Sequence, residues 1–216
     1  GGWFGARSQT SSTVALHNWV QTSTAYINNE GHIHIITHAE SSDGVTPSTI
    51  NTDFIELLLD VNIDSAVYDA TVLDASNFVG EVSGDGVGNV AKFNDTFTSG
   101  LINPSGTWTG EFSNAGYDLI EVLNGSVYGK QINLNGGQAQ QLFSFNILSI
   151  LEKKYGISIW NGKTSVVDRV AIAKAVVSAI KGRYWGYGSS PLGNKATFRM
   201  WNKVTAQWST GNAITT

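Results

Sequence analysis

The sequence predicts a mainly β protein: a jelly-roll-like antiparallel β-sandwich with two α-helices, at about 141–155 and 166–181. Three observations support this fold class. Short runs with apolar residues at every second position recur along the chain, separated by turn-forming Gly, Asn and Pro. Helical periodicity is confined to the stretch from Gln140 to Lys181. Hydrophobic residues occupy 41% of the 216 positions, enough for a sizeable core.

The first predicted helix shows apolar residues at the spacing of one helix face, at Phe143, Ile147, Ile150 and Leu151. Gly156 is placed to end it, because glycine readily adopts the left-handed conformation of a helix C-terminus. We expect this helix to bury its apolar stripe against one end or face of a sheet.

The second predicted helix has a clearer start. Ser165, with Asp168 three residues later, resembles a capping box in which Asp replaces the usual Glu or Gln. An apolar stripe from Val167 to Ile180 follows, and Gly182 would end the helix. Neither helix has the roughly 18 unbroken apolar residues that a membrane span requires, so no membrane role is expected.

The strands are predicted wherever short runs alternate between turns. Adjacent strands can pair without long crossovers, so an antiparallel arrangement is favoured. The predicted strands are Val14–Val20, His32–His38, Asp53–Val61, Phe78–Val82, Lys92–Phe97, Tyr117–Leu123, Arg183–Tyr187, Ala196–Trp201 and Val204–Trp208.

Histidines on one predicted strand raise the question of a metal site. His32, His34 and His38 fall on one face of this strand, and Ile33 and Ile35 on the other. Two histidines at i and i+2 could bind a metal. No carboxylate lies at a diagnostic spacing, so a polar outer face is favoured, and we expect neither a metal nor a cofactor.

Composition narrows the range of partners. The formal net charge is −4 and no basic cluster is visible, which argues against nucleic acid. The absence of cysteine excludes disulfides and thiolate metal sites. The first ten residues lack the pattern of a signal peptide, and the start Gly1-Gly2 without Met indicates a fragment or a trimmed chain.

Aromatic residues combined with low charge indicate a surface for neutral polar ligands. Seven Trp and seven Tyr accompany many Asn, Thr, Ser and Gly, while charged residues reach only 14% against about 25% in soluble domains. Aromatic faces pack on the C–H groups of sugar rings, and amides and hydroxyls bind sugar hydroxyls. The alternative is that most Trp residues belong to the core, where aromatic side chains contribute large buried areas.

Catalysis receives little support. A glycoside hydrolase needs two carboxyl groups about 5–10 Å apart. Asp118 with Glu121, or Glu56 with Asp60, could be proposed, but nothing in the sequence pairs them. No serine nucleophile motif accompanies the histidines. We therefore expect a protein that is not an enzyme.

Several strings resemble one family: the β-sandwich repeats in tail, baseplate and neck proteins of tailed phages and prophages of Gram-positive, mainly lactic-acid, bacteria. This resemblance implies a carbohydrate-binding module. It covers most of the chain and rests on Gln140–Phe145, Lys154–Gly156, Trp185–Pro191, Gly193–Ala196 and Ser42–Asp53.

The order of these strings departs from the family, in which the segment resembling Ser42–Val61 comes last. Residues 1–61 are therefore interpreted as the end of one repeat, or as strands that complete the sandwich formed by 62–216; a single permuted domain is the alternative. The piece Trp3–Ser12 also faintly resembles Trp208–Thr216.

The sequence thus favours a non-catalytic, extracellular module of a phage virion that binds host cell-wall polysaccharide. Its other partners would be virion structural proteins, and the oligomeric state stays open. The alternative is a structural spacer or decoration domain without a ligand. The candidate saccharide-binding residues are Trp108, Trp185, Tyr187, Asn194, Arg199, Trp201 and Trp208.

Overall fold

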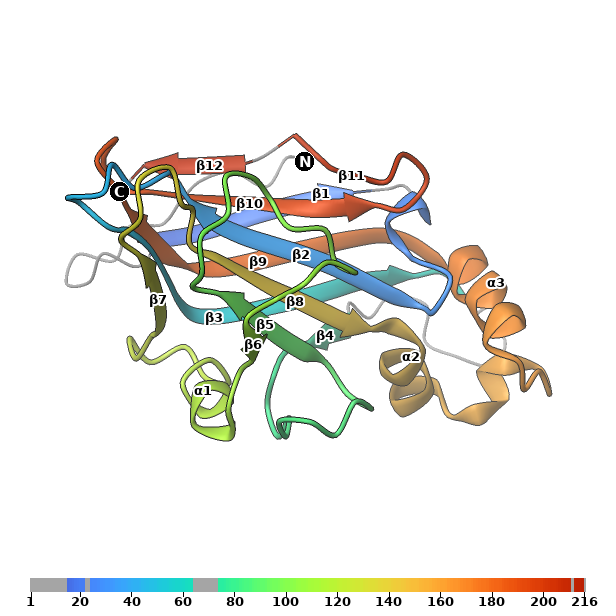
Figure 1. The fold of residues 1–216 in the computed structure, drawn as a ribbon. Helices are drawn as coiled ribbons and strands as arrows, with labels where there is room; N and C mark the ends of the chain where they lie inside the picture. The colour runs from blue at the N-terminus through green and yellow to red at the C-terminus, as the bar shows by residue number, and fades with distance from the viewer. Residues whose placement is uncertain (1–14, 22–23, 64–73, 211, 216) are drawn as a thin grey trace.

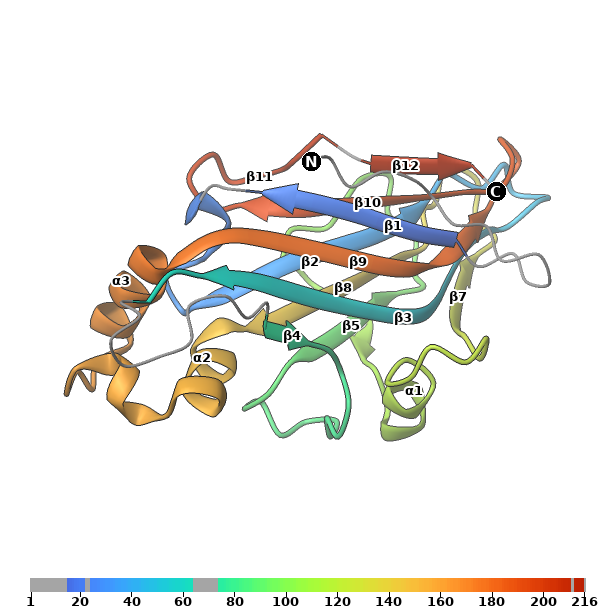
Figure 2. The same ribbon diagram turned by 180° about the vertical axis from the view of Figure 1, so that it is seen from behind.

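Two antiparallel β-sheets packed face to face form the body of the molecule (Figures 1 and 2). The computed structural model describes residues 15–21, 24–63, 74–210 and 212–215. The five-stranded sheet contains β1 (Ala15–Gln21), β9 (Val177–Ser189), β3 (Ser48–Val61), β4 (Asp74–Ser76) and β7 (Tyr128–Ile132). The seven-stranded sheet contains β11 (Gln207–Trp208), β10 (Lys195–Asn202), β2 (His32–Ala39), β8 (Gln140–Asn146), β5 (Val90–Asn94), β6 (Gly110–Glu111) and β12 (Asn212–Thr215). The predicted antiparallel β-sandwich is confirmed.

The strand pairs are nested as in a jelly roll. β1 pairs with β9, β2 with β8, β3 with β7, and β5 with β6, all antiparallel. A long hairpin with this nested pairing forms the two sheets when it rolls up, because β3 then also pairs with β9 and β5 with β8. Strands β10, β11 and β12 extend the sheet that contains β2.

The core between the sheets is apolar and rich in aromatic rings. Strands of both sheets supply inward residues that alternate with outward ones, such as Leu57 and Leu59 of β3 and Phe143 and Phe145 of β8. Phe78 lies 5.3 Å from Phe145 and 5.7 Å from Phe143 between ring centroids. Of the tryptophans whose side chains the structure describes, only Trp160 is fully buried.

Glycines on β9 make room for neighbouring groups. A Cβ at Gly182 would lie 2.5 Å from the ring of Phe198 on β10, in the other sheet. A Cβ at Gly186 would clash with the carbonyl oxygen of Asn51 on β3, in the same sheet, and with the Tyr184 hydroxyl. These positions leave space for Tyr184, whose hydroxyl donates to the Asn51 carbonyl at 2.7 Å.

Helices cover one end of the sandwich (Figure 1). In α2 (Ile147–Tyr155), the Asn146 side chain accepts from the Ser149 N–H, and Gly156 ends the helix at φ 76°. In α3 (Val166–Val176), the Ser165 side chain accepts from the Asp168 N–H, which confirms the predicted cap. The short elements are α1 (Asn114–Asp118) and the 3₁₀ turns η1 (Thr24–Tyr26) and η2 (Ile157–Trp160).

Both predicted helices are shorter than expected, because part of each belongs to a strand. Residues 140–146 form β8, whose backbone groups are taken up by β2 on one side and β5 on the other. Residues 177–181 begin β9, where Val177 and Ile180 pair with Val61 and Leu59 of β3. Pairing within a sheet outweighs the helical spacing of these apolar residues.

Two predicted strands are wrong. Phe78–Val82 forms a turn, because the Asn77 side chain accepts from the Val79 N–H and Gly80 adopts φ 74°. Tyr117–Leu123 overlaps α1 instead, which begins where the Ser113 side chain accepts from the Gly116 N–H.

The segment from β1 to β3 contributes to both sheets. β1 and β3 flank β9, and β2 lies between β8 and β10. These strands therefore pair with strands from the 62–216 part of the chain. Residues 1–14, which include the Trp3–Ser12 piece, lie outside the described residues.

Candidate functional site

A groove of about 360 Å³ lies on the outer face of the seven-stranded sheet. Strands β2, β5, β8 and β10 supply its floor and one rim, and the loop 95–109 between β5 and β6 supplies the other rim. We call this surface the sheet groove. It is lined by Asn28, Glu30, His32, His34, Val90, Lys92, Pro104, Ser105, Leu142, Ser144, Trp201 and Lys203.

Strand alternation places the floor residues. On β2, Ile33 and Ile35 are buried in the core while His32 and His34 face the groove, as the sequence predicted. Antiparallel register sets His34 opposite Ser144 of β8, and Ser144 opposite Val90 of β5. Three strands thus present one surface, with polar groups at His32, His34 and Ser144 beside the apolar Val90 and Leu142.

His34 is locked in one neutral tautomer. The Asn28 amide donates to its Nε2 at 3.1 Å, so Nε2 carries no proton. Its Nδ1 therefore carries the proton and donates to the Ser144 hydroxyl at 2.9 Å. Burial, with smaller contributions from His32 and Lys92, lowers the pKa of His34 to about 3. Both ring nitrogens are occupied, which leaves none for a metal.

His32 is the more accessible partner in a stacked pair. Its ring lies 6.0 Å from that of His34, with 15° between the planes. Burial lowers the pKa of His32 below 6.5, although Glu30 opposes this. His32 is therefore neutral at pH 7 and can offer one donor and one acceptor to a ligand.

The loop 95–109 is fixed over the sheet by buried Gln140. The Gln140 side chain donates to the Gly100 carbonyl at 2.7 Å and accepts from the Ile102 N–H at 3.0 Å. Trp208 donates from its indole nitrogen to the Ile102 carbonyl at 3.1 Å. These bonds hold in place the Pro104–Ser105 rim.

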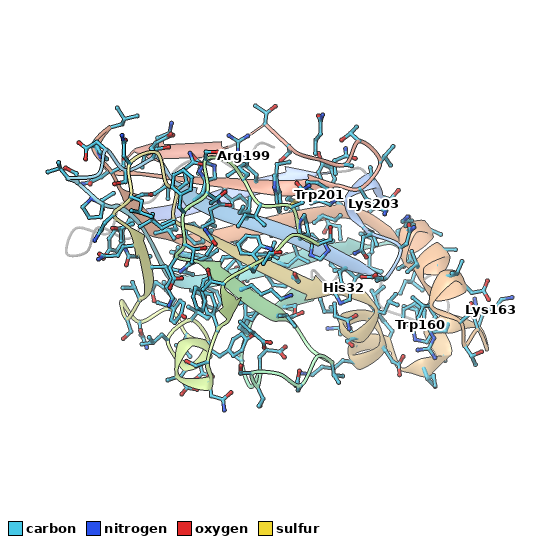
Figure 3. All side chains as sticks on the ribbon, viewed as in Figure 1. His32, Trp160, Lys163, Arg199, Trp201 and Lys203 are labelled. Atoms are coloured by element: carbon cyan, nitrogen blue, oxygen red, sulfur yellow. The ribbon has the colours of Figure 1, made fainter. Side chains whose placement is uncertain are left out.

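Trp201 lines the groove and lies beside Lys203 (Figure 3). Its ring meets that of Trp208 edge-on, with centroids 5.1 Å apart. The side chain is only partly buried. Trp201 in the groove thus packs on Trp208, which in turn donates the hydrogen bond that holds the loop at Ile102.

The structure divides the sequence-predicted residues between two faces. Arg199, Trp201 and Trp208 lie on the outer face of the seven-stranded sheet, but only Trp201 lines the groove. Arg199 donates to His38 Nε2 and to the Ser209 carbonyl, at 3.3 and 3.0 Å. Trp108 lies in the loop 95–109 and donates to the Asn103 carbonyl.

The other predicted residues lie elsewhere. Trp185 and Tyr187 point outward from β9 in the five-stranded sheet, and Trp185 packs against Phe54 at 5.3 Å between centroids. Asn194 is exposed in the turn between β9 and β10. These residues do not join the sheet groove.

Sequence reasoning did not select Lys92, Ser144 or Lys203. Lys92 and Ser144 lie at outward positions of their strands, and Lys203 lies in the turn after β10. The alternation of β5 carried a signal for Lys92, but the convergence of these residues depends on pairing between strands far apart in sequence.

A second cavity, of about 490 Å³, lies between α2 and the loop after β4. No aromatic side chain lines it, and the hydrogen-bonding groups of Asn89 bind other parts of the protein. This cavity offers less to a sugar ring than the sheet groove does.

Two of the carboxylates considered for catalysis form ion pairs within the five-stranded sheet. Glu56 binds Arg183 at 3.0 Å and Asp60 binds Lys181 at 2.9 Å. Among the described residues, no group of three or more His, Asp or Glu could hold a metal ion. No helix in that part of the chain is long and apolar enough to cross a membrane.

Comparison with protein-family models, curated proteins and solved structures finds no match.

Proposed function

We propose that this chain is a non-catalytic module of a phage virion that binds host cell-wall saccharides in the sheet groove. The single observation that carries the proposal is the partly exposed ring of Trp201 in a groove that also presents the polar side chains of His32 and Ser144. A sugar ring would pack on the indole, and its hydroxyls would bind His32 and Ser144. The placement in a virion rests on the sequence resemblance alone.

The geometry supports binding without chemical change. Neutral histidines and the Ser144 hydroxyl line the groove beside Val90, Lys92 and Leu142, and the acidic lining residue is the exposed Glu30. Cleavage of a glycosidic bond would need a second carboxyl group about 5–10 Å away, and the groove lining contains none.

Each groove would bind weakly, because an open groove on a sheet face leaves part of a bound ligand in contact with water. Repetition of the module in a virion would supply avidity, since linked sites raise the effective concentration of one another. Weak single sites would also let a particle bind and release a cell surface several times before it attaches stably.

One observation favours the alternative of a structural domain without a ligand. Two of the predicted ligand residues, Arg199 and Trp208, form internal contacts that stabilise the sheet and its loop. If every aromatic on this face served such contacts, no sugar platform would remain. Trp201 distinguishes the two functions because it lines the groove.

The test compares Trp201→Ala with Trp185→Ala, which removes the same side chain from the opposite face. Both would be displayed in many copies on beads and exposed to wall polysaccharide from Gram-positive lactic-acid bacteria. Trp201→Ala is expected to weaken binding at least about tenfold, equivalent to about 1.4 kcal/mol. Trp185→Ala should bind like the unmodified chain.

Thermal unfolding of each variant and of Trp201→Phe, which keeps an aromatic ring, would separate binding from folding. The absence of binding to every wall preparation, or equal losses in the two Trp→Ala variants, would reject the proposal.

A further inference from the structure

The sheet groove contains two of the described cations that form no ion pair, and the others of this kind, Lys153, Lys163, Lys174 and Arg199, do not line it. Five ion pairs occur among the described residues, and they engage Lys130, Arg169, Lys181, Arg183 and Lys195. Lys92 and Lys203 form no ion pair within that part of the chain, yet both line the groove. The sequence has 17 Asp and Glu against 13 Lys and Arg, so carboxylates outnumber the cations that could pair with them.

The groove also presents more hydrogen-bond donors than acceptors. Asn28 accepts from the N–H groups of Glu30 and His32 and donates to His34, which occupies its carbonyl and one amide hydrogen. Ser144 accepts from His34, so its own hydroxyl hydrogen is not used in that bond and can be donated to a ligand. The ammonium groups of Lys92 and Lys203 add hydrogen-bond donors and no acceptors.

The charge of the groove differs in sign from that of the chain. Two lysines face the groove against one glutamate, and its histidines are neutral at pH 7. The whole sequence carries a formal charge of −4. A local excess of cations on an acidic protein attracts an anion and raises its local concentration.

We propose that the sheet groove selects anionic saccharides, in which a phosphate or carboxylate substituent binds Lys92 and Lys203 while the sugar ring packs on Trp201. This inference rests on the proposed function and names the ligand class that the groove prefers. Lys203 lies beside Trp201 (Figure 3), so an aromatic face and a cation are offered together.

The test uses Lys92→Gln, Lys203→Gln and the double variant, with Lys163→Gln as the matched control. Lys163 is exposed and lies near the start of α3, away from the groove (Figure 3). The probe is lactic-acid bacterial wall polysaccharide in three forms: untreated, dephosphorylated with hydrofluoric acid, and carboxyl-reduced with carbodiimide and borohydride.

Each lysine substitution is expected to weaken binding of the untreated polysaccharide about threefold, and the double variant about tenfold. Lys163→Gln should bind like the unmodified chain. Loss of binding to the dephosphorylated form would identify phosphate as the anion, and loss with the carboxyl-reduced form would identify carboxylate. Added salt should weaken the unmodified chain more than the double variant.

The outcomes separate this inference from the proposed function. If all three forms bind equally and the lysine variants match the unmodified chain, saccharide binding stands and the selection of anions is refuted. If the untreated polysaccharide fails to bind the unmodified chain, the proposed function fails and this inference fails with it.

Discussion

On the outer face of the five-stranded sheet, Trp185 packs against Phe54, and the neighbouring cations Lys181 and Arg183 bind carboxylates of β3. On the outer face of the seven-stranded sheet, Trp201 lines a groove with two lysines that have no carboxylate partner among the described residues. Both faces carry outward tryptophans on long strands. They differ in what surrounds the indole. Trp185 is surrounded by an aromatic contact and ion pairs between strands of its own sheet, whereas Trp201 lies in a groove that the loop 95–109 also lines.

The difference shows that an outward tryptophan of this protein lines a groove where a loop forms a wall beside the sheet. The loop 95–109 supplies that wall, and Gln140 and Trp208 fix it by three hydrogen bonds. The buried amide that anchors the loop is therefore as much a part of the site as the residues that would touch a sugar.

Removal of that anchor is expected to have the largest effect. Gln140→Ala would leave the Gly100 carbonyl and the Ile102 N–H without their partner and lower the free energy of unfolding by about 2 to 3 kcal/mol. Chemical denaturation would measure the change, and hydrogen exchange should show faster exchange at 100–106. Gln131→Ala, at an exposed position of β7 in the other sheet, is the control. Unchanged exchange in the loop would contradict the anchoring role.

The second largest effect is expected from acid, which should destabilise the folded protein by protonating His38 on β2 of the seven-stranded sheet. Burial, with Arg199 and Lys195 contributing, lowers the pKa of His38 from 6.5 to about 4, so the unfolded chain binds a proton there before the folded chain does. Stability from this residue is complete above 6.5 and falls as the pH drops toward 4. The loss at pH 5 is about 2 kcal/mol.

Unfolding curves at pH 7 and pH 5 would check this, with His38→Gln as the comparison. The variant is expected to be less stable at pH 7 but to lose less on acidification, because it has no group to protonate at this position. Equal losses in the two proteins would show that other groups control the acid response.

The five-stranded face should give the smallest effect. Lys181→Gln removes the 2.9 Å pair with Asp60, whose partners are both partly exposed, and should change the free energy of unfolding by at most about 1 kcal/mol. Binding to wall polysaccharide should not change. A loss of binding equal to that of Lys203→Gln would mean that both faces take part, and the contrast between them would disappear.

Local patterns in the sequence predicted much of the fold. Ile33 and Ile35 alternate with His32 and His34, and the structure places these pairs on opposite sides of β2. Ser165 and Asp168 marked the start of α3 because a cap depends on residues a few positions apart. Asn77 and Gly80 show the opposite case, since the apolar Phe78 and Val79 predict a strand where the Asn77 side chain and the positive φ of Gly80 form a turn.

The sequence by itself determined the layers of this protein, since strand alternation and helix caps depend on neighbours along the chain. Only the tertiary structure decided where β8 and β9 begin, because strands from distant segments capture the apolar residues that also fit a helix. It alone brought Lys92, Ser144, Trp201 and Lys203 to one groove. Lys92, Ser144 and Trp201 lie on strands, and Lys203 on the turn after β10, that only the pairing of distant segments brings together, and no spacing along the chain predicts that pairing.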